Sequence, residues 1–211
     1  MLVPAMNSEE IIREIMLDYA SVDRKSLYLS QNLRRKVVKS KNNTFCDITD
    51  YKSLRKNDWV ILVVCNRKGQ CRITVVHYLN QFGFNVVNVY ARDKIQHFSG
   101  HFLERYNERY LMQNDLTKLD LIKNFVSHNI MIVHEVIDPA DLKIRRIIGR
   151  FKQGVGLGTV EYINGIHVID YKTFISNEML YENQKDEVKT MEEYYHSFLD
   201  KDHIFKRIAS Y

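Results

Sequence analysis

Near the start of the chain, apolar residues recur every three to four positions, which is the spacing of one face of an α-helix. This pattern predicts a first helix over residues 7–20, in which Asn7 and Glu10 have the spacing of a capping box. Apolar positions with the same spacing follow and predict a second helix over about residues 22–38. The first part of the chain is therefore expected to be helical.

A run of basic residues closes the second predicted helix and includes Arg34, Arg35 and Lys36. A charge run of this kind is typical of a solvated helix face. Contact with nucleic-acid phosphates is the alternative interpretation, because arginine and lysine neutralise phosphate charge.

From residue 58 the pattern changes to short apolar runs rich in Val and Ile, separated by loops that contain Gly and Asn. Such runs are typical of antiparallel strands. Asn164-Gly165 is the strongest hairpin signal in the sequence. The predicted strands cover residues 59–65, 71–78, 84–90, 130–136, 144–151, 159–163 and 166–175.

Strands that occur in groups, and not one by one between helices, indicate an α+β fold. We expect antiparallel meanders at about 58–90 and 130–175, packed with helices. The further predicted helices cover about residues 99–112, 116–127 and 185–208.

The polar, poorly patterned residues 42–57 are the candidate place for a domain boundary. A boundary there would separate an N-terminal helical segment, residues 1–56, from an α+β domain, residues 57–211. The alternative is a single domain over residues 1–211.

The formal net charge is +5 and the sequence pI is about 9.0. A basic balance favours polyanionic partners such as RNA, although charges of both signs are well mixed here. Three cysteines argue against a disulfide framework. Because no apolar run is long enough to cross a membrane and no secretory signal begins the chain, we expect a cytoplasmic protein without a membrane partner. The oligomeric state is not indicated.

The most informative stretch lies within the helix predicted at 99–112. His101, Arg105 and Arg109 are spaced i, i+4, i+8 and share one face of that helix. Glu104 and Glu108 lie beside them, so the i,i+4 neighbours carry like charges, which destabilises an isolated helix by about 0.2–0.5 kcal/mol per pair. A face that serves only solubility would alternate the signs. Two interpretations of this helix face are therefore open: a functional anion-binding site, or a solvated surface stabilised by ion pairs.

A histidine with two arginines on neighbouring turns has the groups that bind and cleave a phosphodiester. Arginine matches phosphate oxygens with its planar fork, and histidine moves protons near neutral pH. Metal-independent RNA cleavage also requires a base for the 2′-hydroxyl, and Glu108 would serve if burial raised its pKa. This chemistry requires no cofactor.

The sequence FSGHFLERYNER resembles the S-x-H-A-x-x-R-x-x-x-R helix of small bacterial domains related to the RelE and BrnT toxins. These domains belong to the barnase–EndoU–colicin–RelE ribonuclease class, in which such a helix precedes an antiparallel meander. The matching residues are Ser99, His101, Arg105 and Arg109, whereas Phe102 stands where the family has a small residue.

The resemblance covers about residues 97–175 and implies an endoribonuclease with an antitoxin or another protein partner. The stretch IHVIDYKTF is similar to the family's late strand. It would place Lys172 near the helix as a catalytic residue, with Tyr171 and Thr173 contacting RNA.

Two rival interpretations remain open. His97, His101 and Glu104 supply the ligand types of a catalytic zinc, which would make the chain a metal-dependent hydrolase. His97 precedes the predicted helix, however, so we expect no bound metal. The other rival is a non-enzymatic interaction protein, in which the additional helices contact a partner.

Overall fold

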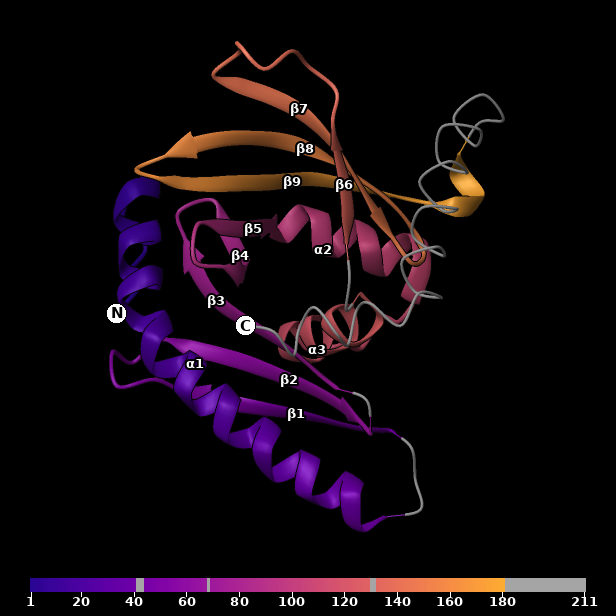
Figure 1. Cartoon of the computed structure of the whole chain (residues 1–211). Coiled ribbons are helices and arrows are strands. Elements are labelled where there is room, and N and C mark those ends of the chain that lie inside the picture. Colours follow the sequence, from indigo (N-terminus) through magenta and orange to yellow (C-terminus); the bar gives the residue numbers. More distant parts are fainter. Residues whose placement is uncertain (41–43, 68, 130–131, 181–211) are drawn as a thin grey trace.

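A computed structural model of the protein describes residues 1–40, 44–67, 69–129 and 132–180. Nine strands form one sheet in the order β1-β2-β3-β4-β5-β9-β8-β7-β6. Within it β5 and β9 are parallel, whereas the other neighbouring strands are antiparallel. The sheet curves around α2 and α3, and α1 lies outside the curve (Figure 1). This confirms the predicted α+β class with helices packed on a largely antiparallel sheet.

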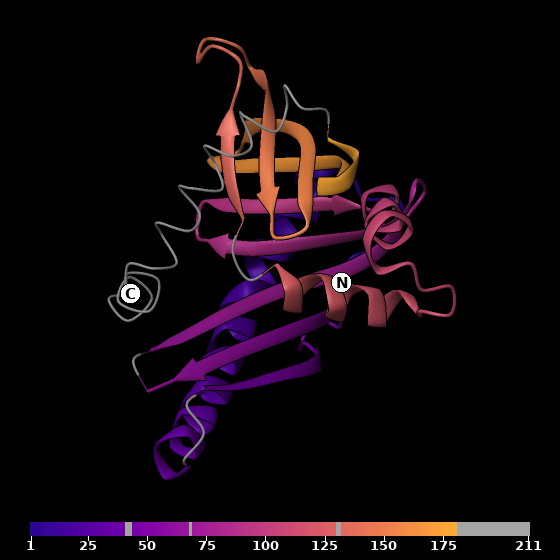
Figure 2. The ribbon, with the colours of Figure 1, turned by 90° about the vertical axis from the view of Figure 1, so that its right-hand side faces the viewer.

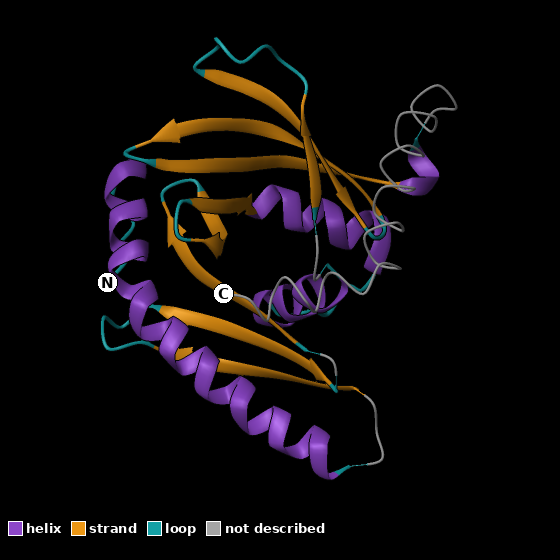
Figure 3. Cartoon of the chain, viewed as in Figure 1, coloured by secondary structure: helices purple, strands orange, loops and turns teal. Residues whose placement is uncertain are grey.

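The helical elements are α1 (Ser8–Lys39), α2 (Gly100–Tyr106), the π-helical turn η1 (Asn107–Leu111), α3 (Lys118–His128) and the 3-10 turn η2 (Asn177–Met179). The strands are β1 (Thr44–Lys52), β2 (Asp58–Asn66), β3 (Gln70–Asn80), β4 (Gly83–Ala91), β5 (Lys94–Ser99), β6 (Val133–Val136), β7 (Ile144–Phe151), β8 (Gly154–Ile163) and β9 (Ile166–Ser176). Figure 3 shows these elements by type. The helix predicted over 185–208 lies outside the described residues.

The two helices predicted at the start of the chain are one continuous helix, α1. Its N-terminus has the predicted capping box, in which the Asn7 side chain accepts from the Glu10 amide and the Glu10 side chain accepts from the Asn7 amide. The prediction of a break near residue 21 was wrong, because no Gly or Pro stands there and the buried Val22 continues the apolar stripe.

Residues 42–57, the candidate boundary, contain a strand that the sequence pattern did not reveal. β1 pairs with β2 along its whole length, from Thr44 opposite Asn66 to Lys52 opposite Asp58. The strand β5 was also missed, although it joins the two meanders through its parallel pairing with β9. Both predicted meanders are thus present, and they form parts of a single sheet.

The sheet is covered on both faces, and alternate residues of each strand serve different cores. In β2, Trp59 and Ile61 pack beneath α1, whereas Val60 and Leu62 pack against the side of α2 and α3. Figure 2 shows α1 behind the strands and α3 in front of them. Because α1 and α2 lie on opposite faces, their exposed side chains face different directions.

Buried carboxylates fasten α1 to the segment that leads into β2. Asp18 accepts hydrogen bonds from Asn57 Nδ2 at 2.8 Å and Trp59 Nε1 at 2.9 Å. Glu14 accepts from both Nε and Nη2 of Arg55, at 2.9 and 2.5 Å. These bonds satisfy charges that would otherwise be costly to bury.

Two glycines in the second meander allow aromatic side chains to approach the sheet. A Cβ atom at Gly149 would lie 2.4 Å from the Tyr171 hydroxyl, and one at Gly156 would lie 2.5 Å from Phe151. The concave face is thereby able to hold the aromatic core beneath α2. In the described part of the chain, no helix is long and apolar enough to span a membrane.

Candidate nucleic-acid interface

The helix of greatest interest begins where the sequence predicts and then changes its winding. Ser99 caps α2, since its Oγ accepts from the Phe102 amide at 3.2 Å. After Tyr106 the chain widens into the π-helical turn η1, which ends at Met112 with a left-handed φ of 52°. Short π-helical turns are frequent at functional sites.

One side of α2 is the predicted apolar docking face. Phe102, Leu103 and Tyr106 are fully buried against the sheet and α3. The aromatic rings packed around them are Phe98, Phe125, Phe151, Tyr171 and Phe174. This packing fixes the rotation of the helix and therefore the direction of its polar side.

The polar side of α2 faces solvent. His101 is exposed, and its ring makes no hydrogen bond with the described residues. Arg105 Nη1 bonds Glu108 Oε2 at 2.6 Å, with 39% and 56% of the two side chains exposed. An ion pair this exposed contributes little and is readily exchanged for another anion. Because Glu108 is exposed, the burial on which its role as a base depends is absent.

Arg109 is held differently from Arg105. It is half-buried, and its Nη1 donates to the main-chain carbonyl of Phe174 in β9. No carboxylate within the described ranges pairs with it or neutralises its positive charge. The bond ties η1 to the end of β9 and holds the guanidinium in place.

The sheet residues expected beside this helix lie elsewhere. Tyr171 is fully buried beneath α2, with its ring stacked on Phe98 at 5.3 Å between centroids. Burial raises the pKa of Tyr171, so its hydroxyl stays protonated. Lys172 lies on the other face of the sheet, where it bonds Asp170. Neither Tyr171 nor Lys172 reaches the polar side of α2.

A β-bulge explains why Thr173 also points away from α2. In the β8–β9 register Tyr171 is opposite Gly158 and Thr173 is opposite Leu157, so Lys172 is an extra residue. The alternation of side chains is therefore shifted, and Phe174 replaces Thr173 in the core beneath the helix. The contact between η1 and β9 forms at Phe174 and not at the predicted Lys172 or Thr173.

The residues of the proposed zinc site are separated. His97 lies in β5, where Nδ1 bonds Asp170 Oδ1 at 2.8 Å and Nε2 lies 2.9 Å from Asn85 Oδ1. These groups occupy the face opposite α2, so His97 does not share a site with His101. Among the residues with described positions, no group of three His, Cys, Asp or Glu side chains is placed to hold a metal ion.

The hydrogen bonds of His97 also affect Asp170. Burial raises the pKa of Asp170, but the bonds and charges of His97 and Lys172 outweigh that effect, and the pKa lies below its ordinary value of 3.8. The hydrogen bonds of His97 to Asn85 and Asp170 join β4, β5 and β9 on the convex face of the sheet. Their geometry is that of a structural link between the two meanders.

The basic run at the end of α1 lies far from α2 in the fold. Arg34, Arg35 and Lys36 are all exposed. Because α1 covers the opposite face of the sheet, these residues and the Arg105–Arg109 surface form two separate basic surfaces.

Three residues that gather around the C-terminal end of α3 were missed by the sequence reasoning. His128, at the end of α3, has its Nδ1 3.1 Å from the Tyr106 hydroxyl. Tyr110 of η1 stands edge-on to the His128 ring, with centroids 5.9 Å apart. Burial lowers the pKa of His128, and the charge of Lys152 lowers it further, so both effects favour the neutral ring. Tyr110 follows Arg109 in the sequence, but only tertiary packing brings His128 to Tyr110 and Lys152 to the end of α3.

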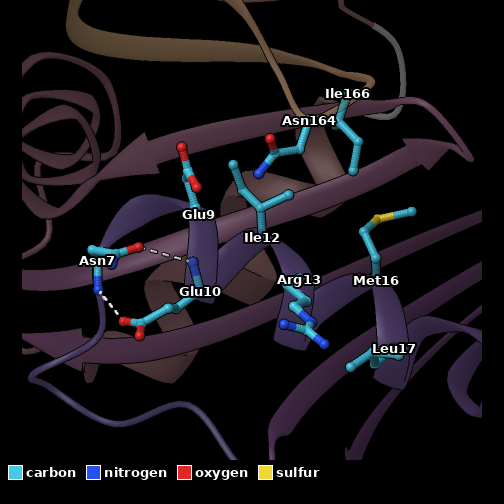
Figure 4. A pocket seen from close by; sticks show the side chains of 9 residues that line it. All are labelled: Asn7, Glu9, Glu10, Ile12, Arg13, Met16, Leu17, Asn164 and Ile166. Carbon is cyan, nitrogen blue, oxygen red and sulfur yellow. Dashed lines mark hydrogen bonds between the residues drawn. The ribbon is translucent and has the colours of Figure 1, made fainter.

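A surface pocket of about 460 Å³ lies away from these residues (Figure 4). It is formed between the N-terminal turns of α1 and the turn that joins β8 to β9. The side chains that line it are Asn7, Glu9, Glu10, Ile12, Arg13, Met16, Leu17, Asn164 and Ile166. No residue predicted for the functional site lines it.

No protein-family model matches the chain, and neither a curated protein nor a solved structure matches it.

Proposed function

We propose that the protein binds RNA through the polar side of α2 and η1, with Arg105 and Arg109 holding the phosphodiester chain. The observation that carries this proposal is the environment of Arg109. Its guanidinium is positioned by a main-chain carbonyl and is not neutralised by a carboxylate in the described chain. A fixed, uncompensated arginine is suited to phosphate oxygens, which accept two parallel hydrogen bonds from its fork.

The order of elements supports the proposal. The helices α2 and α3 precede the antiparallel meander β6–β7–β8–β9, and α2 packs on the meander through β9. This is the arrangement expected from the resemblance to RelE-like and BrnT-like domains. A shared order of elements supports a fold relationship, whereas the activity has to be tested at the site.

The narrower proposal is a metal-independent, toxin-like endoribonuclease of the bacterial cytoplasm, with an antitoxin as its protein partner. In it His101 transfers protons to or from the RNA, one turn before Arg105. The imidazole is exposed and has no hydrogen bond to any residue that the structure describes, so it can reach a bound phosphodiester. Lys172 has no part in this proposal, because it lies on the opposite face.

Two charge-matched double variants test RNA binding. Arg105→Gln/Arg109→Gln and Arg34→Gln/Arg35→Gln each remove two positive charges, but from opposite faces of the protein. Binding of a fluorescein-labelled single-stranded RNA is measured by anisotropy over a series of salt concentrations. We expect the first variant to weaken binding and to reduce the slope of log K against log salt by about 1.4, since each phosphate contact with a single strand contributes about 0.7.

The second variant is expected to change that slope by less than half as much. A larger loss in the α1 variant would move the binding surface to α1 and contradict the proposal. Thermal unfolding of both variants shows whether the loss of the Arg109–Phe174 bond has disturbed the fold.

A separate assay tests cleavage. End-labelled RNA is incubated with wild-type protein and with His101→Ala in excess EDTA. The narrower proposal predicts cleavage by the wild type, and a loss of at least about 100-fold in the variant with RNA affinity retained. Cleavage that EDTA abolishes, or that His101→Ala leaves unchanged, would refute it.

A further inference from the structure

An exposed aromatic ring stands next to the proposed phosphate-binding arginines. Tyr110 is 39% exposed, although its ring also contacts Tyr106 at 5.4 Å between centroids and His128 at 5.9 Å. These two neighbours hold the ring at fixed angles, 42° and 90° to their own planes. Tyr110 is thus both positioned and accessible.

The neighbours of Tyr110 are themselves anchored in the core. Tyr106 is fully buried, packs edge-on against Phe125 and Phe174, and bonds His128 Nδ1 through its hydroxyl. His128 closes α3, whose Phe125 belongs to the same core. A ligand that stacks on Tyr110 would therefore meet a surface that needs little reordering.

Two basic residues lie in the neighbourhood of this ring. Arg109 precedes Tyr110 in η1. Lys152 is exposed, and its amide donates to Asn129 Oδ1 at 3.3 Å, which places the Lys152 backbone beside the end of α3. Lys152 is close enough to His128 for its charge to act on the ring. An exposed aromatic ring with basic residues nearby matches a nucleotide, whose base stacks while its phosphates are neutralised.

We propose that the RNA bound at this surface is single-stranded, and that one of its bases stacks on Tyr110 beside His128 with the flanking phosphates at Arg109 and Lys152. This inference rests on the proposed function and specifies its substrate class. Bases within a duplex are already stacked on each other, so they are not available to an aromatic side chain. The surface therefore favours unpaired over paired RNA.

Three variants and two RNAs test this inference. Tyr110→Ala removes the ring, and Tyr110→Phe keeps a stacking ring without the hydroxyl. Tyr28→Ala is the matched control, because Tyr28 is also an exposed tyrosine, 56% exposed with Lys25 over its ring, but lies on α1. The probes are a fluorescein-labelled RNA of about 12 nucleotides and the duplex of the same sequence, and anisotropy gives both affinities.

For the single strand we expect Tyr110→Ala to weaken binding by about 5- to 160-fold, the range typical of one stacked base. Tyr110→Phe and Tyr28→Ala should remain within about twofold of the wild type. Wild-type binding of the duplex should be weaker and insensitive to Tyr110→Ala.

If wild-type protein binds the single strand but Tyr110→Ala binds it equally well, this inference is overturned and the proposed function stands. Equal affinity for duplex and single strand would overturn the inference in the same way. If neither RNA binds at low salt, the proposed function fails and the inference fails with it.

Discussion

The buried carboxylate of Glu14 provides a quantitative test of how α1 is fastened to the sheet. Glu14 is only 6% exposed and accepts two hydrogen bonds from Arg55, one from the amine of Met1 at 2.5 Å and one from Asn57 Nδ2 at 3.2 Å. The bonds from Arg55, with smaller effects of the Met1 amine and Asn57, lower the pKa of Glu14 from 4.5 to about 2, against the opposing effect of burial. The substitution Glu14→Gln keeps the size of the side chain and removes its charge.

The lowered pKa has a defined consequence for stability. A carboxyl whose pKa falls from 4.5 to about 2 on folding contributes about 3 kcal/mol to the free energy of unfolding at neutral pH. Because 42% of the Arg55 side chain is exposed, solvent screening reduces this to about 2–3 kcal/mol. Since the folded pKa is the lower one, the contribution is fully present above pH 4.5 and is lost as the pH falls toward 2.

Urea unfolding, followed by fluorescence, measures this contribution directly. The single tryptophan, Trp59, is 1% exposed and bonds Asp18 close to Glu14, so it reports on this region. We expect Glu14→Gln to be less stable by about 2–3 kcal/mol at pH 7, with the difference shrinking between pH 4.5 and 2. The control is Glu135→Gln, at an exposed glutamate of β6. A difference below about 0.5 kcal/mol at pH 7, or one independent of pH, would refute the reasoning.

Three further predictions follow from the sheet. Gly149→Ala should lower stability by about 1–3 kcal/mol in thermal unfolding, because its Cβ would overlap the Tyr171 ring, and an unchanged midpoint would contradict the packing. His97→Ala should lower the free energy of unfolding by about 1–3 kcal/mol at pH 7 in urea, because Asp170 loses a hydrogen bond. Since the pKa of Asp170 is lowered in the folded state, this loss should be present above pH 3.8 and shrink below it, whereas a loss that grows on acidification would contradict the reasoning. Lys172→Ala should leave RNA affinity within about twofold in anisotropy, and a tenfold loss would place RNA on the convex face.

Local signals in the sequence were sufficient where the structure depends on neighbouring residues. The capping box of Asn7 and Glu10 is present as predicted. Asn164 and Gly165 form the tight turn between β8 and β9, with φ values of 50° and 86° in the left-handed region. In both cases a few adjacent side chains decide the backbone conformation.

The missed strands depend on contacts that are distant in the sequence. β1 is an edge strand, and its mostly exposed residues do not alternate regularly between apolar and polar. β5 has six residues and is covered on both faces, so a period of two is not visible in its sequence. Its parallel pairing with β9 joins elements that no local pattern connects.

The candidate site was predictable on its helical side and not on its sheet side. Helical spacing correctly places Arg105 on the polar side of α2 and Phe102 in the core. The placement of Lys172 and Thr173 depends on a one-residue bulge in β9, which has no distinct signal in the sequence. His128 meets Tyr110 only because α3 packs against α2, so its participation required the structure.

Ultraviolet crosslinking of an RNA that contains 4-thiouridine tests the central claim most directly, because mass spectrometry of the crosslinked peptides locates the bound strand without any substitution. The account predicts crosslinks within residues 100–111, which comprise α2 and η1, and at the peptides that contain His128 and Lys152. Crosslinks confined to α1, residues 8–39, or to the convex face around Lys172 would contradict it.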